Sequence, residues 1–322
     1  MTATPTETLI TVFGGSGFLG RHVVRALAKR GYRIRVAVRR PDLAFHLQPA
    51  GRVGQIHAVQ ANLRHPGSVD AAVRDADAVV NLVGILFERG RQRFDTVQAF
   101  GAEACALSAA AHGARLVHVS AIGADEQSSS HYARSKAAGE KLVRAAVPSA
   151  TILRPSIVFG PEDAFFNRFA AIARLAPALP LIGGGRTRLQ PVFAGDVAAA
   201  VVAAIEGRTI AGATYELGGP AVRTFKELMQ FLLNTIERRR LLLPVPFELA
   251  KVPAFFMQFL PTPLLTPDQV ELLRYDNVVS DQAKQERRTL EGLGIAPTLM
   301  EAVVPAYLQR FRKTGQFRVR SI

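Results

Sequence analysis

Several features of secreted and membrane-spanning proteins are scarce in this chain of 322 residues. Its one cysteine, Cys105, cannot form an internal disulfide, which favours a reducing compartment, and we expect its thiol in the core. No uninterrupted apolar run reaches the roughly 18 residues of a membrane-spanning helix. Residues 252–267 come nearest, and their four prolines predict a poor helix. The first residues show neither a signal segment nor an arginine-rich presequence, so we expect no signal peptide and no transmembrane helix.

Acidic residues are also few relative to basic ones. Asp and Glu number 26 against 40 Lys and Arg, which gives a formal net charge of +14, and the excess is spread over both halves of the chain. A basic surface favours a polyanion, an anionic lipid or an acidic partner protein, and composition does not choose among them. Because the charge is diffuse and lacks an aromatic and basic cluster, no nucleic acid partner is expected. Metal-ligand spacing is missing too, so no metal is expected.

The remaining composition is that of a globular protein, with 48% hydrophobic and 20% charged residues. Until residue 160, short apolar runs alternate with helical segments of a dozen or more residues. This alternation predicts an α/β fold, a Rossmann-type doubly wound parallel sheet, followed by a smaller, mixed C-terminal lobe. The expected strands are residues 9–13, 34–38, 56–60, 78–83, 116–119 and 214–217, and a long alanine-rich helix is expected at 94–111.

The turn between the first strand and the first helix is rich in glycine, spaced Gly14-x-x-Gly17-x-x-Gly20. Gly14 permits a tight turn, Gly17 lets a pyrophosphate approach the backbone, and Gly20 lets the helix pack close to the sheet. The free N–H groups at the helix start then face the phosphates. We therefore expect a dinucleotide site that includes Gly14, Ser16, Gly17, Phe18, Leu19 and Gly20.

The second strand ends at Arg39 and Arg40, about 20 residues after the last glycine, where an NAD site places an acidic residue. A guanidinium here would pair with the 2′-phosphate of NADP(H), whereas a carboxylate would repel it. The pair therefore favours NADP(H) over NAD(H). The alternative is a solvated arginine pair after a strand.

Two further strand ends offer cofactor contacts. Asn62, with Leu63 after the third strand, is placed where its side chain could bond the adenine amine, although a plain turn asparagine is the alternative. Leu82, Val83 and Gly84 close the fourth strand, and Gly84 allows close approach of a ligand. Open α/β sheets bind ligands beyond the carboxyl ends of their strands, so these ends are expected to share one site.

A candidate reaction site follows the fifth strand. Ser120 ends this strand, and Tyr132 and Lys136 lie four residues apart on one helix face. A nearby ammonium favours the phenolate and so lowers the pKa of a tyrosine from about 10 towards neutrality. Ser120 could steady a substrate oxygen, and Lys136 could bond the nicotinamide ribose. All three residues are candidates for catalysis, or for cofactor contact alone.

Together with residues 154–161, which read Arg-Pro-Ser-Ile-Val-Phe-Gly-Pro, these motifs resemble the short-chain dehydrogenase/reductase superfamily in its extended or atypical branch. The resemblance implies that Pro155, Ser156 and Ile157 run beside the nicotinamide. Arg154 is expected to serve packing or a local ion pair. Residues 1–160 would then be the NADP(H)-binding Rossmann domain, and residues 161–322 a lobe for docking or substrate, with some segments returning to the sheet.

Within that lobe, Asp196 is expected to cap a helix over 197–206, and Thr224-x-x-Glu227 is a capping box for a helix over 225–238. Residues 241–247 and 252–265 combine aromatics with prolines, and three arginines precede them directly. They either line a substrate pocket or form an apolar docking surface for membrane or protein. The alternative is that these apolar residues form the core of the lobe and that the arginines form a solvated face.

Residues 264–279, with residues 12–20 and 132–140, resemble a narrower family, the NADPH-binding accessory subunit of respiratory complex I called alpha-subcomplex subunit nine. The resemblance implies a nucleotide held mainly as a structural ligand at the junction of the peripheral and membrane arms. It also implies other complex I subunits and the membrane surface as partners. Since no presequence is seen, a bacterial counterpart is expected, peripheral on the cytoplasmic side of the inner membrane.

Two other functions stay open at this point. The intact pair of Tyr132 and Lys136 would also suit a free NADPH-dependent short-chain reductase or a nucleotide-sugar epimerase. A nucleotide-sensing or RNA-binding member of the atypical branch is the other alternative. Independent turnover is not expected under the accessory-subunit interpretation, and no substrate can be named from the lobe.

Overall fold

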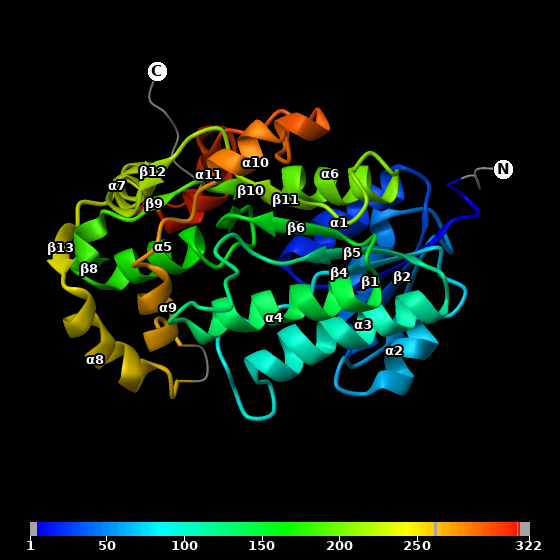
Figure 1. Ribbon diagram of the computed structural model, residues 1–322. Helices are drawn as coiled ribbons and strands as arrows, with labels where there is room; N and C mark the ends of the chain where they lie inside the picture. Colours follow the sequence, from blue (N-terminus) through cyan, green and yellow to red (C-terminus); the bar gives the residue numbers. More distant parts are fainter. Residues whose placement is uncertain (1–4, 261–262, 314, 316–322) are drawn as a thin grey trace, which may run out of the picture. The chain divides into compact units, whose positions relative to one another are not determined.

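The computed structural model describes residues 5–260, 263–313 and 315. The chain forms two compact units (Figure 1). The first comprises Met1–Pro155, Ala194–Leu217 and Ser280–Ala296, and the second Ser156–Phe193, Gly218–Val279 and Pro297–Ile322. Each unit has a hydrophobic core of its own and is described by itself.

The first unit contains a seven-stranded sheet in the order β11-β6-β5-β4-β1-β2-β3, in which every neighbouring pair is parallel. The strands are β1 (Leu9–Phe13), β2 (Arg33–Val38), β3 (Ile56–Gln60), β4 (Ala78–Asn81), β5 (Arg115–Val119), β6 (Thr151–Pro155) and β11 (Thr214–Leu217). The order reverses between β1 and β4, which is the switch point of a doubly wound sheet. The predicted Rossmann-type fold is confirmed.

Helices cover both faces of this sheet (Figure 1). They are α1 (Phe18–Lys29), α2 (Pro66–Val73), α3 (Phe100–Ala111), α4 (His131–Ala146) and α6 (Ala194–Ile205), with the short α10 (Asp281–Gln285) and 3-10 turns at Pro41–Ala50 and Glu291–Leu293. Helices α2, α3 and α4 share one core with the sheet, in which Cys105 is fully buried as expected. Helices α1 and α6 pack on each other over the opposite face.

Two boundaries predicted within residues 1–160 differ from the structure by more than one residue. Strand β4 ends at Asn81, because the Asn81 side chain accepts the Val83 N–H at 3.1 Å and turns the chain. The long helix expected at 94–111 is interrupted at its start, where Asp95–Ala99 forms a π-helical turn before α3. Such turns insert one extra residue and are frequent at functional sites.

The second unit is built around an aromatic core. Its strands are β7 (Val158–Phe159), β8 (Ala178–Ile182), β9 (Arg188–Leu189), β10 (Val192–Phe193), β12 (Arg223–Thr224) and β13 (Leu241–Val245). Its helices are α5 (Phe166–Leu175), α7 (Phe225–Thr235), α8 (Phe247–Met257), α9 (Pro267–Leu272) and α11 (Met300–Leu308), with 3-10 turns at Gly183–Gly185 and Gln309–Phe311. Phe159, Phe166 and Phe225 are almost fully buried where α5, α7 and α11 meet.

One helix start predicted for the lobe differs from the structure, one segment expected to be a poor helix is helical, and one helix start is confirmed. Asp196 was expected as a cap, but α6 begins at Ala194, so the carboxylate lies inside the first turn, where it still faces the positive end of the helix. Helix α8 runs through Pro253, contrary to the poor helix expected there. The carbonyl that loses its partner belongs to Leu249, which is 64% exposed, so water can replace the missing N–H. The capping box of Thr224 and Glu227 is confirmed.

Across residues 5–260, 263–313 and 315, every helix is either too short or too polar to cross a lipid bilayer.

Candidate functional site

The glycine turn after β1 is shaped by backbone contacts that only glycine permits. Gly14 adopts φ +77°, and its carbonyl accepts the Gly17 N–H at 3.0 Å. A Cβ on Gly20 would lie 2.2 Å from the carbonyl oxygen of Gly14 and 2.6 Å from the carbonyl carbon of Gly15. Helix α1 therefore packs directly on the turn, as the motif predicts.

The start of α1 offers a cradle for a negatively charged group. Gly17 is the N-cap in an extended conformation, it is exposed, and a Cβ there would meet only the Gly14 carbonyl within 4 Å. No acidic residue occupies the first turn, so the free N–H groups and the positive helix end are uncompensated. This arrangement fits a pyrophosphate approaching the backbone.

The ends of β2 and β3 lie beside this turn. The Gly14 N–H bonds the carbonyl of Ala37 at 3.2 Å, and both following arginines, Arg39 and Arg40, are exposed. The Arg40 guanidinium pairs with Asp42, with 2.7 Å between Nη2 and Oδ2, whereas Arg39 forms no ion pair with any of the described residues. Arg39 is therefore the arginine whose guanidinium is the more available to an incoming phosphate.

Asn62 lies in the next strand end, where the Ala61 N–H bonds the Val38 carbonyl at 2.9 Å. Its Oδ1 accepts the Arg64 N–H at 3.2 Å, which is the bond of a plain turn asparagine, and its Nδ2 is not used in that bond. Leu63 is 9% exposed and packs close to Gly101 on α3, so its side chain belongs to the core.

The residues after β4 contact two parts of the site. A Cβ on Gly14 would lie 3.2 Å from Cγ2 of Val83 and 3.5 Å from the carbonyl carbon of Leu82. A Cβ on Gly84 would lie 3.2 Å from Nζ of Lys136. The stretch from Leu82 to Gly84 thus connects the glycine turn with the reaction residues, and a larger residue at position 84 would displace the ammonium.

Lys136 and Ser120 lie together at the carboxyl end of β5, and both are buried. The Lys136 ammonium donates to the Val119 carbonyl at 3.3 Å, one residue before Ser120. Burial lowers the pKa of Lys136 to about 8, against the opposing effect of the Glu140 carboxylate. The Ser120 hydroxyl is buried without a hydrogen-bond partner among the described residues, as expected of a group that serves a ligand.

Tyr132 lies one turn before Lys136 on α4, whose start is capped by Ser130 through a bond from the Ala133 N–H at 3.2 Å. The tyrosine ring meets the edge of Phe94, with 5.8 Å between ring centroids. Because Phe94 is buried, this contact limits the positions that the tyrosine ring can take. The ring lies on the same face of α4 as Lys136.

Arg154 forms the local ion pair expected for it. Its Nε and Nη2 each lie 2.8 Å from a carboxylate oxygen of the buried Glu140, a bidentate bond that fastens α4 to β6. Pro155 ends β6 and accepts the Ile122 N–H at 3.0 Å. The site residues predicted in the first unit therefore lie at the carboxyl ends of its strands or on helices α1 and α4.

Ser156 and Ile157 belong to the second unit. There the Ser156 hydroxyl lies 2.9 Å from the Asn277 carbonyl and 2.6 Å from Asn277 Oδ1, so it donates to one of these oxygens. Asn277 lies in the segment that carries the narrower family resemblance. The resemblance predicts that Ser156 contacts the nicotinamide. In the structure its hydroxyl already donates a hydrogen bond to Asn277.

Two buried polar residues beside Lys136 were missed by the sequence interpretation. Gln98 lies in the π-helical turn and His118 on β5, and each is 1% exposed. A π-turn has no distinct periodicity over five residues, and a histidine in an apolar strand carries no motif. The one signal available was a histidine within an otherwise apolar run, two positions before Ser120.

Comparison with known proteins agrees with this geometry. Residues 10–218 match the family described as the NAD dependent epimerase/dehydratase family. The chain belongs to this family. The predicted superfamily is therefore confirmed, and with it a site of the NAD(P)-binding type.

Relatives refine the placement within the epimerase/dehydratase family. A protein of Arabidopsis thaliana named NADH dehydrogenase (ubiquinone) 1 alpha subcomplex subunit 9, mitochondrial, is 38% identical over 319 residues, which cover 95% of this chain and 78% of the relative. The predicted resemblance to the subunit nine family is confirmed. A ceramide reductase of Caulobacter vibrioides is 38% identical over 201 residues, 62% of each chain.

A solved member of the epimerase/dehydratase fold superposes well. The dTDP-glucose 4,6-dehydratase DesIV of Streptomyces venezuelae, with NAD bound, reaches a TM-score of 0.70 at 20% identity and covers 94% of this chain and 96% of its own. At this identity the likeness supports the fold alone.

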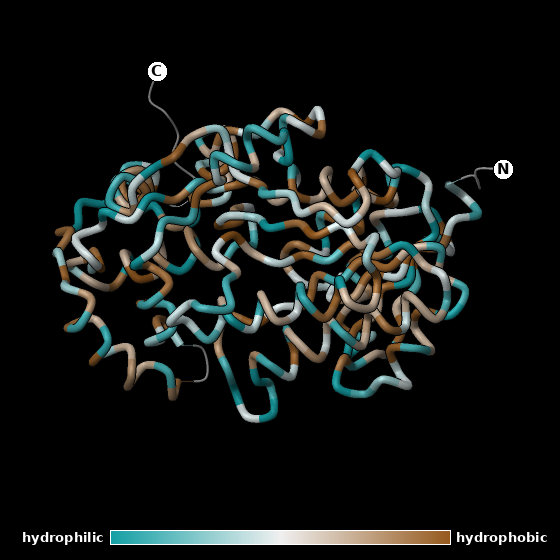
Figure 2. The backbone as a smooth tube through the Cα atoms, viewed as in Figure 1, coloured by the Kyte–Doolittle hydropathy of each residue, from teal (hydrophilic) through white to brown (hydrophobic). Residues whose placement is uncertain are grey.

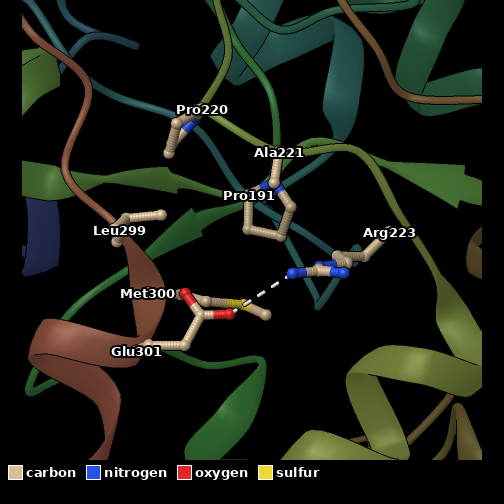
Figure 3. A pocket seen from close by; sticks show the side chains of 7 residues that line it. All are labelled: Pro191, Pro220, Ala221, Arg223, Leu299, Met300 and Glu301. Atoms are coloured by element: carbon tan, nitrogen blue, oxygen red, sulfur yellow. Dashed lines mark ion pairs between the residues drawn. The ribbon is translucent and has the colours of Figure 1, made fainter.

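The second unit of the present chain contains a small pocket (Figure 3). Its lining residues are Pro191, Pro220, Ala221, Arg223, Leu299, Met300 and Glu301. The Arg223 guanidinium and the Glu301 carboxylate face each other across it at 3.6 Å. None of the predicted site residues lines this pocket, and its charged groups already pair with each other.

Proposed function

We propose that this chain is an NADP(H)-binding accessory subunit of respiratory complex I, the NADH:quinone oxidoreductase. Similarity to alpha subcomplex subunit 9 of Arabidopsis thaliana over 95% of the chain is the observation that carries the proposal. In this proposal residues 1–160 bind the nucleotide, and residues 161–322 form the lobe that docks at the junction of the peripheral and membrane arms. The subunit is peripheral, on the cytoplasmic side of a bacterial inner membrane.

The nucleotide is proposed to be NADP(H) rather than NAD(H). The support is the exposed Arg39 beside the glycine turn, in the place where a carboxylate would otherwise bond the ribose hydroxyl. Gly17 and the α1 start would hold the pyrophosphate, and Lys136 and Ser120 the nicotinamide half. Bound in this way the nucleotide is a structural ligand that stabilises the folded chain by mass action.

The docking surface is proposed to be the β13–α8 patch. We give this name to the nine large apolar side chains exposed by residues 241–264, out of twenty exposed by the described part of the chain. They are Leu241, Leu243, Leu249, Val252, Phe255, Phe256, Phe259, Leu260 and Leu264. Figure 2 shows apolar residues along the same stretch.

The two sides of α8 explain this exposure. Ala250 and Ala254 face the core that also contains Val270 of α9 and are 2% and 0% exposed, whereas Phe255 and Phe256 of the same helix are 52% and 67% exposed. Helix α8 thus turns its small residues to the core and its aromatic residues to solvent. Such a helix is suited to the boundary of a bilayer or to an apolar partner. Arg239, exposed just before β13, supplies a positive charge near an anionic headgroup.

Native gel electrophoresis of solubilised membranes tests the proposal. A tagged copy of the chain at its natural locus is expected to comigrate with NADH:quinone oxidoreductase activity and to co-purify with its subunits. If the chain migrates alone at every detergent concentration that keeps the oxidoreductase intact, the accessory-subunit role fails.

A second candidate function is a free NADPH-dependent reductase. The specific observations that favour it are the unpartnered Ser120 hydroxyl, the Lys136 pKa of about 8, and the similarity to a ceramide reductase over 62% of the chain. Tyr132 would then give a proton to the substrate oxygen, and the nicotinamide would supply hydride. This function predicts substrate-dependent NADPH oxidation that Tyr132→Phe abolishes while NADPH affinity remains. Inactivity of the wild-type chain with ceramide precursors and simple ketones would count against it.

A further inference from the structure

Two buried side chains lie near Lys136: the lysine charge acts on His118, and a Cβ on Gly84 would lie within 3.4 Å of both Gln98 Oε1 and Lys136 Nζ. Nε2 of His118 and Oε1 of Gln98 are buried and have no hydrogen-bond partner among the described residues. Both side chains are 1% exposed, so bulk water does not reach them. A buried polar atom left unpaired loses its hydration without compensation, so two such atoms near a buried ammonium call for a shared partner.

The environment of His118 fixes its tautomer. The backbone N–H of Val83 is a donor, so the Asn81 side-chain atom 3.1 Å away is the oxygen, and its nitrogen faces His118. That nitrogen donates to Nδ1 of the imidazole at 3.3 Å. Nδ1 is therefore an acceptor, and the proton of the neutral ring lies on Nε2. The unpaired atom of His118 is consequently a donor.

Gln98 presents the complementary acceptor. Its Nε2 donates to Oγ of Ser135 at 3.0 Å, which leaves Oε1 pointing away from that bond. A Cβ on Gly84 would lie 3.4 Å from this oxygen and 3.2 Å from Lys136 Nζ, so both atoms border the space that Gly84 leaves open. Gly139 of α4 holds the turn in place, because a Cβ there would lie 2.3 Å from the Gln98 carbonyl oxygen.

We propose that His118 and Gln98 hold one internal water molecule against the Lys136 ammonium and act through it as positioning residues for the lysine. The water accepts from His118 Nε2–H and from a Lys136 N–H, and it donates to Gln98 Oε1. Three polar partners are the number that a buried water typically has. One ammonium proton is already used by the Val119 carbonyl at 3.3 Å, so the water leaves the third proton directed at the nucleotide site.

The charges around the lysine agree with a neutral imidazole. Glu140 on the same helix raises the pKa of Lys136, but its carboxylate is shared with Arg154. Burial and the lysine charge together lower the pKa of His118 to about 3. His118 is thus an uncharged donor over the whole physiological range and does not compete with Lys136 for a proton.

The first test needs no nucleotide. Long-range 15N–1H NMR correlation spectra of the full chain, labelled at histidine, report which ring nitrogen carries the proton. We expect His118 as the Nε2–H tautomer, unchanged from pH 5 to 9, with a cross-relaxation contact from this proton to a water that exchanges slowly. Protonation of the ring near pH 6.5, or the opposite tautomer, would overturn the proposal.

The second test is a double-mutant cycle with His118→Phe and Gln98→Met, which remove the donor and the acceptor with little change in volume. Each change is expected to weaken NADPH binding about 3- to 10-fold, and the double variant should bind no more weakly than the worse single variant, because one water serves both. Additive effects would mean that the two residues act independently, and the shared water would be excluded.

Two controls keep the outcomes apart. His118→Gln retains an N–H donor and should restore most of the affinity, and the affinity for 2′,5′-ADP, which lacks the nicotinamide half, should stay unchanged in every variant. The affinity measurement rests on the proposed nucleotide site. If the wild-type chain binds no NADPH, the proposed function fails, and the NMR measurement still decides the inference.

Discussion

At the carboxyl ends of β4 and β5 the first unit buries polar side chains, whereas along β13 and α8 the second unit exposes apolar ones. Lys136 is 4% and Gln98 1% exposed, while Phe255 is 52% and Phe256 67% exposed. Both regions reverse the usual rule of burial. Each reversal costs stability in the isolated chain, and in the proposed function a partner would recover this cost: a nucleotide at the first region and an apolar surface at the second. The following substitutions break or sharpen this comparison.

Gly20→Ala is expected to have the largest effect, because the new Cβ would meet backbone atoms 2.2 Å away. The expected loss is about 3 kcal/mol in the free energy of unfolding, with NADPH affinity reduced more than 100-fold. Urea denaturation and calorimetric titration measure the two effects. Gly67→Ala on α2 is the matched control, since its Cβ would meet nothing within 4 Å and the helix should be as stable or more stable. Equal losses in both variants would contradict the packing argument.

Lys136→Met should stabilise the nucleotide-free chain while weakening NADPH binding. The folded pKa of about 8 lies below the unfolded value near 10.5, so below pH 8 both states hold the proton and the folded state bears the cost of a buried ammonium. That cost is on the order of 3 kcal/mol and is relieved as the pH rises from about 8 to 10.5.

The expected result is therefore a variant more stable than the wild type at pH 7, with an advantage that shrinks above pH 8. Wild-type affinity for NADPH should also decline above pH 8, when the ammonium is lost. Thermal unfolding across pH measures the first effect, with Lys141→Met, whose side chain is 74% exposed, as the control. A destabilised Lys136→Met would show that the ammonium is not a burden in the nucleotide-free chain.

Phe256→Ser with Phe259→Ser addresses the other region. The pair should reduce partition onto anionic vesicles by about 2–3 kcal/mol, because two exposed aromatic rings no longer enter the bilayer boundary. The free energy of unfolding should change little, since neither ring is buried. Vesicle flotation measures the partition, and Ile210→Ser, at a residue of the first unit that is 64% exposed, is the control. Unchanged flotation of the double variant would assign the patch to a protein partner.

Arg39→Ser is expected to weaken NADPH binding about 10-fold and to leave NADH binding unchanged, since only the 2′-phosphate loses its counter-ion. Arg40→Ser should have the smaller effect of the two, because its guanidinium is shared with Asp42 at 2.7 Å. Arg33→Ser at the opposite end of β2 is the control for net charge. Parallel losses for both nucleotides would argue against discrimination by Arg39.

Much of the first unit could be predicted because local signals and tertiary structure agree there. Residues 56–60 form β3 as expected, and the glycine spacing placed the turn and α1 correctly. In the second unit, the capping box of Thr224 and Glu227 could be predicted as well, because its two bonds join residues three apart. The bidentate pair of Arg154 with Glu140 was expected only as a local ion pair of unspecified partner.

The rest depended on contacts between distant residues. The π-helical turn that aims Gln98 is fixed by close packing against Gly139, 41 positions along the chain, so a helical pattern at 94–111 cannot reveal it. Helix α8 forms despite Pro253 because Ala250 and Ala254 are buried against a core formed with α9, and this burial outweighs a weak local propensity.

The last strand of the sheet has a consequence for synthesis of the protein. Strand β11 pairs with β6, yet residues 214–217 follow β6 by almost sixty positions. While a ribosome is still making those residues, Ile152 and Leu153 lie on an open strand edge that can recruit a neighbouring nascent chain. A chaperone that shields this edge during translation would therefore raise the yield of native protein, and a fragment that stops at residue 160 would tend to self-associate.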